Sequence, residues 1–158
     1  QPDTMRIYPT VVLAGTALAK LYASGAYRMM PLSDMIDLCA QLLELFYGVG
    51  IRVIRCGLHA QDGISESRVA GYYHPAFREL CESRMLLRRM QDQTGTPQPG
   101  HTYVFRVHPS WLSRGIGHQG VNRAWFAQRG AGLRLIQDPA CGMGVCIRDT
   151  GKETLGCS

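Results

Sequence analysis

The sequence predicts an α/β fold followed by a small α+β domain. Residues 6–13 form a short apolar run, residues 34–47 carry apolar side chains at helical spacing, and residues 51–58 form a second apolar run. Two strands joined by a crossover helix lie parallel in one sheet, so this succession predicts a βαβ unit. Residues 102–147 then combine short strands and one helix in a β-α-β-β order, which predicts a second, smaller unit.

Capping residues and glycines set the expected ends of the first two helices. Thr16 is expected to cap a helix over residues 17–23 that stops at Gly25. Ser33, which follows a proline, is expected to cap the long helix over residues 34–47. The apolar residues at helical spacing in that helix are Met35, Leu38, Cys39, Leu42, Leu45 and Phe46.

A third helix with an arginine-rich outer face is expected over residues 76–90, and His74 is expected to be a capping residue at its start. Residues 91–100 read QDQTGTPQPG, a composition that predicts a linker. We therefore expect one domain over residues 1–90 and a second over residues 101–158. In the second domain we expect strands at 102–108, 133–136 and 144–147, a glycine-containing turn at 113–120 and a helix at 121–128.

Composition excludes some classes of protein. No apolar run approaches the roughly 20 residues that a membrane-spanning helix needs, so we expect a cytoplasmic protein without membrane contact. The chain begins Gln1-Pro2-Asp3 and lacks an initial Met, which predicts a fragment of a larger protein. Cys39 and Cys56 lie in apolar periodic segments, where thiols usually act as small buried apolar groups. We predict neither a disulfide framework nor a metal site.

Ligand sites of parallel α/β folds lie at the carboxyl ends of the strands. In this chain the predicted strand ends carry two short polar and glycine-containing segments. They comprise Ala14, Gly15 and Thr16 after the first strand, and Gly57, Leu58, His59 and Gln61 after the second. A ligand site is therefore expected where these segments meet.

Three segments of the chain match a family pattern in order and spacing. Residues 7–18 read IYPTVVLAGTAL and continue at 21–27 as LYASGAY, residues 53–59 read VIRCGLH, and residues 70–80 read AGYYHPAFREL. Together they resemble the radical S-adenosylmethionine (SAM) enzymes related to the catalytic subunit of Elongator and to oxygen-independent coproporphyrinogen oxidase-like proteins. The resemblance implies that the first domain is the last βα units of a partial TIM-type barrel.

The resemblance also implies cofactors. Enzymes of this family bind a 4Fe-4S cluster through a CxxxCxxC loop and use it to cleave S-adenosylmethionine. No three of the six cysteines here have that spacing, so the cluster ligands are expected in the missing N-terminal half of the same barrel. That half is the first expected partner. We predict no catalytic residue in this chain and no activity for it alone.

For cofactor binding the candidates are Thr10, Arg55, Gly57 and His59. Adenine and a methionine carboxylate need close backbone approach together with hydroxyl or cationic partners. The alternative is that Thr10 and Gly57 only shape strand ends, and that Arg55 pairs with a carboxylate of the barrel. His59 stands where the family commonly has Gln, so its contact is the least certain to carry over.

A second motif points to nucleic acid. Ile116 precedes Gly117, His118, Gln119 and Gly120, a GxxG sequence that resembles the loop of KH-type RNA-binding modules, where phosphates approach the backbone. Arg114 and Arg123 flank it. The alternative is a tight turn whose glycines only permit positive φ. Trp111, Trp125 and Phe126 are expected either to stack on bases or to belong to the core.

Basic residues support the same partner. Residues 83–137 contain a single acid, Asp92, and many arginines, namely Arg84, Arg88, Arg89, Arg106, Arg114, Arg123, Arg129 and Arg134. Such a field attracts polyanions. Two functions therefore remain open: an enzyme that modifies a tRNA base and grips the RNA with its tail, or an enzyme acting on a small molecule such as a porphyrinogen, with the tail as a structural or interaction module.

Overall fold

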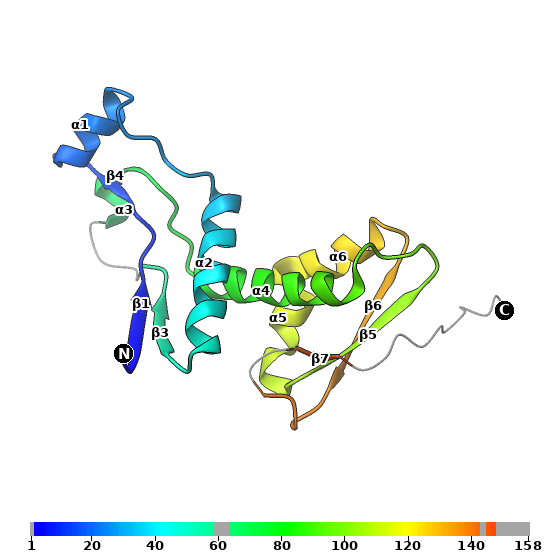
Figure 1. Ribbon diagram of the computed structural model, residues 1–158. Coiled ribbons are helices and arrows are strands. Elements are labelled where there is room, and N and C mark those ends of the chain that lie inside the picture. The colour runs from blue at the N-terminus through cyan, green and yellow to red at the C-terminus, as the bar shows by residue number, and fades with distance from the viewer. Residues whose placement is uncertain (1, 59–63, 143–144, 148–158) are drawn as a thin grey trace. The chain divides into compact units, whose positions relative to one another are not determined.

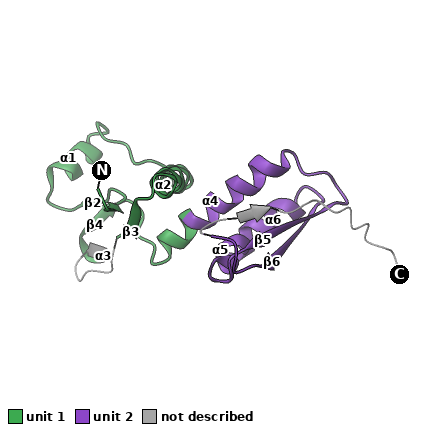
Figure 2. Cartoon of the chain, turned by 60° about the horizontal axis from the view of Figure 1, so that its bottom comes forward, with its two compact units in different colours: residues 1–81 green, residues 82–158 purple. Residues whose placement is uncertain are grey.

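The computed structural model describes residues 2–58, 64–142 and 145–147 (Figure 1). The chain divides into two compact units, Gln1–Cys81 and Glu82–Ser158 (Figure 2). The division falls inside helix α4 (Phe77–Thr94). None of the helices in the described residues is long and apolar enough to cross a membrane.

The first unit contains the predicted βαβ arrangement. Strands β1 (Thr4–Ile7) and β3 (Arg52–Cys56) pair in parallel, with Ile7 opposite Cys56, and helix α2 (Leu32–Gly48) connects them along the chain and contacts β3. A register shift leaves Ile54 without a partner opposite it. The parallel direction of the two strands confirms the sequence prediction. Helix α2 buries the side chains Met35, Ile36, Cys39 and Leu43, and removal of such apolar surface from water stabilises the unit.

The first strand, however, is shorter than predicted and ends at Ile7. Pro9 lacks the N–H that would continue the ladder and restricts the residue before it, so the chain leaves the strand there. Val12–Leu13 then forms a separate strand, β2, which pairs antiparallel with β4 (Arg68–Ala70). The expected single strand over 6–13 is therefore wrong, and the carboxyl end of β1 lies at residues 8–10 rather than at 14–16.

Two of the three predicted helix caps are confirmed. The Thr16 side chain accepts a hydrogen bond from the Ala19 amide at 3.2 Å, at the start of α1 (Ala17–Ala23). His74 Nδ1 accepts one from the Ala76 amide at 3.1 Å, just before α4. Ser33 is not a cap, because α2 already begins at Leu32, with Pro31 before it and no side-chain cap.

The long helices also differ in detail from the predictions. In α2 the buried residues are Met35, Ile36, Cys39, Ala40 and Leu43. Leu38 and Leu45, which were expected on the apolar face, are 44% and 58% exposed. Helix α4 runs past the expected end at residue 90 and includes 91–94, the first residues of the predicted linker. Gly95, with φ of 62°, marks the end of the helix.

The second unit is built on a three-stranded sheet. Strand β5 (Thr102–Val107) lies at its centre, parallel to β6 (Gly132–Gln137) and antiparallel to β7 (Val145–Ile147). Between β5 and β6 the chain forms η1 (Pro109–Trp111), α5 (Leu112–Ile116), η2 (His118–Gly120) and α6 (Val121–Ala127). Alternate residues of β5, namely Tyr103, Phe105 and Val107, are buried, and the rings of Tyr103 and Phe105 contact Phe126 of α6.

The order of elements here is β-α-α-β-β rather than the predicted β-α-β-β. Residues 112–116 form the short helix α5 where a turn was expected. Gly115 within it is buried, and a Cβ at this position would lie only 2.8 Å from the side chain of Leu135 in β6. Close packing against the sheet thus explains a glycine that the sequence suggested was part of a turn. In the described part of the chain the sheets are short, mixed and do not close into a barrel.

Candidate functional site

The carboxyl end of β1 opens onto a hollow in the first unit. A cavity of about 200 Å³ is lined by residues 7–10, by Tyr27, Met29 and Met30, and by Met35, Leu38, Cys39 and Leu42 of α2. Thr10 is exposed and contributes its side chain to this otherwise largely apolar lining. This mostly apolar hollow, with the hydroxyl-bearing residues Tyr8, Thr10 and Tyr27 in its lining, lies at a strand end, the kind of place where α/β folds bind ligands.

The other predicted cofactor contacts do not gather there. Arg55 is half-buried in β3, and neither Arg55 nor Gly57 lines the cavity that contains Thr10. Gly57 adopts φ of 100°, and a Cβ at this position would lie 3.1 Å from the Cβ of Phe77. Its amide donates to the Ile7 carbonyl at 2.9 Å. These contacts give Gly57 a role in shaping the strand end. His59 and Gln61 lie outside the described residues.

A cluster of thiols in the same unit was missed by the sequence analysis. Cys39 of α2, Cys56 at the end of β3 and Cys81 of α4 place their Sγ atoms within 4.8 Å of one another. All three are buried free thiols, with exposed fractions of 4%, 7% and 0%. The expected burial of Cys39 and Cys56 is confirmed. The cluster has no local sequence signature, because each thiol comes from a different element.

The three thiols share their protons unequally. Hydrogen bonds from the Cys56 and Cys81 thiols lower the pKa of Cys39 to about 4. The same hydrogen bonding to Cys39 raises the pKa of Cys56 to about 12, and that of Cys81 is raised as well. Loss of one proton is therefore favoured and loss of a second is opposed, because two thiols can solvate one thiolate but a second charge would lie beside the first.

This cluster does not fit a 4Fe-4S centre. Each cysteine of such a centre binds a different iron at a separate corner of the cluster, which places the sulfurs well apart. Here the three Sγ atoms lie within 4.8 Å of one another, closer than the corners of such a cluster would hold them. These three cysteines are therefore not the ligands of the iron-sulfur cluster of a radical SAM enzyme.

In the second unit, the GxxG residues form a turn between α5 and α6. Gly117 has φ of 89° and ψ of 150°, Gln119 has φ of 53°, and Gly120 has φ of 76°. A Cβ at Gly117 would lie 2.7 Å from the Asn122 amide nitrogen, whereas one at Gly120 would meet nothing within 4 Å. Gln119 is exposed and His118 is half-buried.

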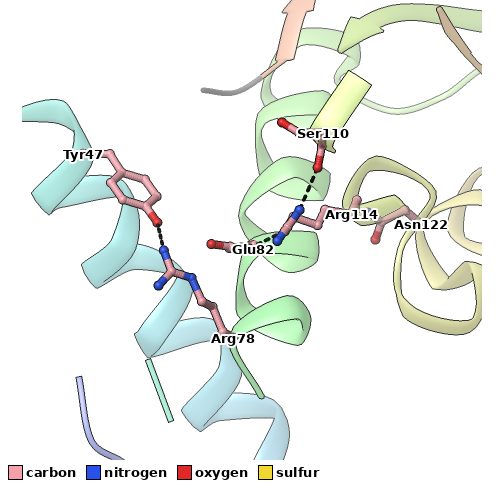
Figure 3. Close-up of polar contacts among 6 residues, drawn as sticks. All are labelled: Tyr47, Arg78, Glu82, Ser110, Arg114 and Asn122. Carbon is pink, nitrogen blue, oxygen red and sulfur yellow. Dashed lines mark hydrogen bonds and ion pairs between the residues drawn. The ribbon is translucent and has the colours of Figure 1, made fainter. Parts of the chain in front are cut away.

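The two polar residues that flank the turn face inward. Arg114 forms an ion pair with Glu82 of α4, whose side chain is 2% exposed, and donates to the Ser110 carbonyl at 2.7 Å (Figure 3). Asn122 is buried, and its amide nitrogen lies 3.0 to 3.1 Å from the carbonyls of Ser83, Arg114 and Gly115. The polar residues Arg114 and Asn122 therefore fix the shape of the turn. Arg123 is exposed on α6.

Two other arginines of the basic stretch also have partners within the second unit. Arg106 pairs with Asp138 at 3.0 Å, and the guanidinium of Arg129 lies 3.9 Å from the centre of the Trp125 ring. Phe126 and Trp111 are buried, with exposed fractions of 0% and 7%, so these two rings belong to the core. Trp125 is half-buried and contacts Phe126 edge-on.

The parallel βαβ unit with a hollow at a strand end is the arrangement in which α/β enzymes bind ligands. The chain belongs to the radical SAM C-terminal domain family, whose model matches residues 2–86. This confirms the family predicted from the sequence motifs.

Elongator complex protein 3 of Mus musculus is 47% identical over 86 residues, which cover 54% of this chain and 15% of that protein. The same protein of Bos taurus is 44% identical and that of Homo sapiens 42% identical, with the same coverage. The chain thus spans about 15% of the length of these curated relatives.

Proposed function

We propose that this chain is part of a radical SAM enzyme that modifies a base of tRNA. In this proposal the first unit supplies the last βα units of a partial TIM-type barrel, and the N-terminal half of that barrel, with its 4Fe-4S ligands, is its partner. The family match over residues 2–86 and the parallel pairing of β1 with β3 support the proposal. The four described free thiols fit a reducing, cytoplasmic compartment.

The cofactor role assigned to this chain is a contribution to one wall of the S-adenosylmethionine site. Thr10 lies in the hollow at the end of β1 and offers a hydroxyl to a polar group of the cofactor. We also assign to this wall Arg55 of β3, Gly57 after that strand, and His59, which lies outside the described residues. Because the thiol cluster does not fit the iron-sulfur centre, no reaction step is assigned to residues of this chain.

The RNA part of the proposal rests on one observation, the GxxG turn between two helices beside a three-stranded sheet. In KH modules such a turn admits the phosphates of single-stranded RNA against the backbone. The side chains available to contact RNA in and next to this turn are those of the exposed Gln119 and Arg123 and the half-buried His118. Arg114, Gly117 and Gly120 contribute by holding the turn in shape, since Arg114 is paired with Glu82 and a Cβ at Gly117 would strike the backbone.

Binding of tRNA to the 158-residue chain at several salt concentrations tests this proposal. With about three phosphate contacts, affinity should fall roughly 30-fold between 50 and 200 mM salt. The double variant Gln119→Asp/Arg123→Gln should weaken binding about 10-fold and reduce the salt slope by about one contact. Gln93→Asp/Gln98→Asp changes the charge by the same two units at exposed positions outside the turn and should bind nearly as the parent does.

Two outcomes would turn the assignment toward the small-molecule alternative. One is tRNA affinity that does not depend on salt or is absent. The other is equal loss in the loop variant and in the control variant, which would indicate general attraction to a basic surface. In either case the coproporphyrinogen oxidase-like function, with the second unit as a structural or interaction module, becomes the better account.

A further inference from the structure

The three thiols of the first unit meet at one point although they are far apart in the sequence. Cys39 lies on α2, Cys56 ends β3, and Cys81 lies on α4, and all three belong to the same compact unit. Their Sγ atoms lie within 4.8 Å of one another and are shielded from solvent. Two helices and a strand thus bring three soft donor atoms together.

The size of this triangle suits a single metal ion. With a zinc–sulfur distance of about 2.3 Å, two thiolates in a tetrahedral site lie about 3.8 Å apart. Sulfurs that already lie within 4.8 Å need only small side-chain rotations to reach that spacing. Thiolate ligands select soft ions such as Zn²⁺ and Cu⁺ over Mg²⁺ and Ca²⁺.

Charge selects a divalent ion among the soft ones. Three thiolates and a divalent ion carry a net charge of −1, whereas three thiolates and Cu⁺ carry −2. The guanidinium of Arg78, one helical turn before Cys81 on α4, donates to the Tyr47 hydroxyl at 2.9 Å (Figure 3). Hydrogen bonding with Cys39 raises the pKa of Cys56, and the positive charge of Arg78 opposes this rise by a smaller amount. One cation beside the cluster neutralises the divalent complex but not the monovalent one. A neutral buried site avoids most of the desolvation cost of a net charge.

We propose that Cys39, Cys56 and Cys81 bind one divalent thiophilic ion of the Zn²⁺ class. The site is separate from the iron-sulfur centre of the proposed enzyme. Binding requires all three sulfurs as thiolates, so one M²⁺ enters and the protons that the sulfurs still hold leave to solvent. The three sulfurs fill three positions of a tetrahedron, and a water molecule takes the fourth. The ion ties α2, β3 and α4 together and so stabilises the strand end on which the proposed cofactor wall depends.

The competing explanation is that the thiols only fill the core as small apolar side chains, which free cysteines commonly do. The two explanations differ in one measurable respect. A packing role is served equally well by Val or Ala of similar size, whereas a metal site is lost when any one sulfur is removed.

Cobalt titration of the reduced, chelator-treated 158-residue chain tests the proposal. We expect a saturable thiolate-to-cobalt charge-transfer band and intense tetrahedral ligand-field bands, with one Co²⁺ bound per chain and full displacement by Zn²⁺. The variants Cys39→Val, Cys56→Val and Cys81→Ala should each lose the charge-transfer band or lower its amplitude by at least a third. Cys141→Ala removes a buried thiol of the other unit and should leave the spectrum unchanged.

A further variant tests the role of charge. Arg78→Met should weaken Zn²⁺ binding about 10-fold, as expected for a group beside the ligands, while Arg78→Lys should retain most of the affinity. Far-UV circular dichroism of each variant separates loss of ligand from loss of fold. Absence of a saturable cobalt band in the parent chain overturns the proposal, and so does a band that persists in the three thiol variants. Failure of tRNA binding leaves this site untouched, because the cobalt readout does not involve RNA.

Discussion

Replacement of Gly117 by alanine is the sharpest test of how the GxxG turn is built. Gly117 has φ of 89° and ψ of 150°, a region that is essentially limited to glycine and costs other residues about 1–3 kcal/mol. The added Cβ would also lie 2.7 Å from the Asn122 nitrogen and 2.9 Å from its Cγ. Because Asn122 is buried and tied to three carbonyls, it cannot move aside, and overpacking adds about 1–3 kcal/mol.

The second glycine of the motif is the matched control. Gly120 also has positive φ, 76°, but a Cβ there meets nothing within 4 Å. Gly120→Ala should therefore cost only the left-handed backbone term, about 1 kcal/mol. Gly117→Ala should cost about 3–5 kcal/mol, which approaches the whole stability of a small domain.

Urea unfolding followed by tryptophan fluorescence measures both variants. The chain has two tryptophans, Trp111 and Trp125, and both lie in the second unit, so the signal reports on that unit. With an m-value near 1 kcal/mol/M, Gly120→Ala should lower the midpoint by about 1 M, and Gly117→Ala should lower it by 3 M or more, or leave no folded baseline. Equal midpoints for the two variants would refute the argument that the first glycine is required by close approach to Asn122.

Three further perturbations test other contacts. Glu82→Gln should lower the free energy of unfolding by about 2 kcal/mol, less than for a fully buried pair because Arg114 is 32% exposed. The control Asp92→Asn, at an exposed acid, should change the free energy of unfolding by less than about 0.5 kcal/mol. Tryptophan fluorescence in urea measures both variants, and equal effects would contradict the reasoning. Asn122→Ala should cost about 2–3 kcal/mol, because three carbonyls lose their donor, and hydrogen exchange should accelerate throughout α5 and α6 rather than only at the turn. Thr16→Ala should cost about 1 kcal/mol and speed amide exchange in α1, while Thr16→Ser should leave it nearly unchanged; protection that stays equal in all three proteins would show that this cap contributes nothing.

Local patterns were sufficient to predict the parallel βαβ arrangement of the first unit and most helices and strands of the second, but not the split of the first strand or the helix α5. The periodicity of α2 and the apolar residues of β3 predict a crossover between parallel strands, and β1 pairs with β3 in that direction. The error over residues 6–13 came from treating a β-branched apolar run as continuous although Pro9 interrupts it. A proline inside a strand pattern is itself a signal of a break, so the sequence contained the information needed to end the strand at Ile7.

The contacts within the candidate sites could not be predicted, because they join residues that are distant in the sequence. The thiol cluster joins Cys39, Cys56 and Cys81, whose separations along the chain match no metal-binding motif. Only the packing of two helices on a strand brings them together. The pairing of Arg114 with Glu82 of α4 likewise depends on tertiary packing, so the sequence beside the GxxG motif does not predict it.

The inward direction of Arg114 and Asn122 changes what the GxxG turn can contribute to recognition. These two side chains connect the turn to α4 through Glu82 and the Ser83 carbonyl, so its backbone is held in one conformation before any ligand arrives. A rigid turn loses little entropy on binding, and its proposed affinity then depends on backbone approach and on the exposed Gln119 and Arg123. For this reason, substitution at Arg114 should alter binding mainly through the shape and stability of the turn, whereas substitution at Arg123 should alter the dependence on salt.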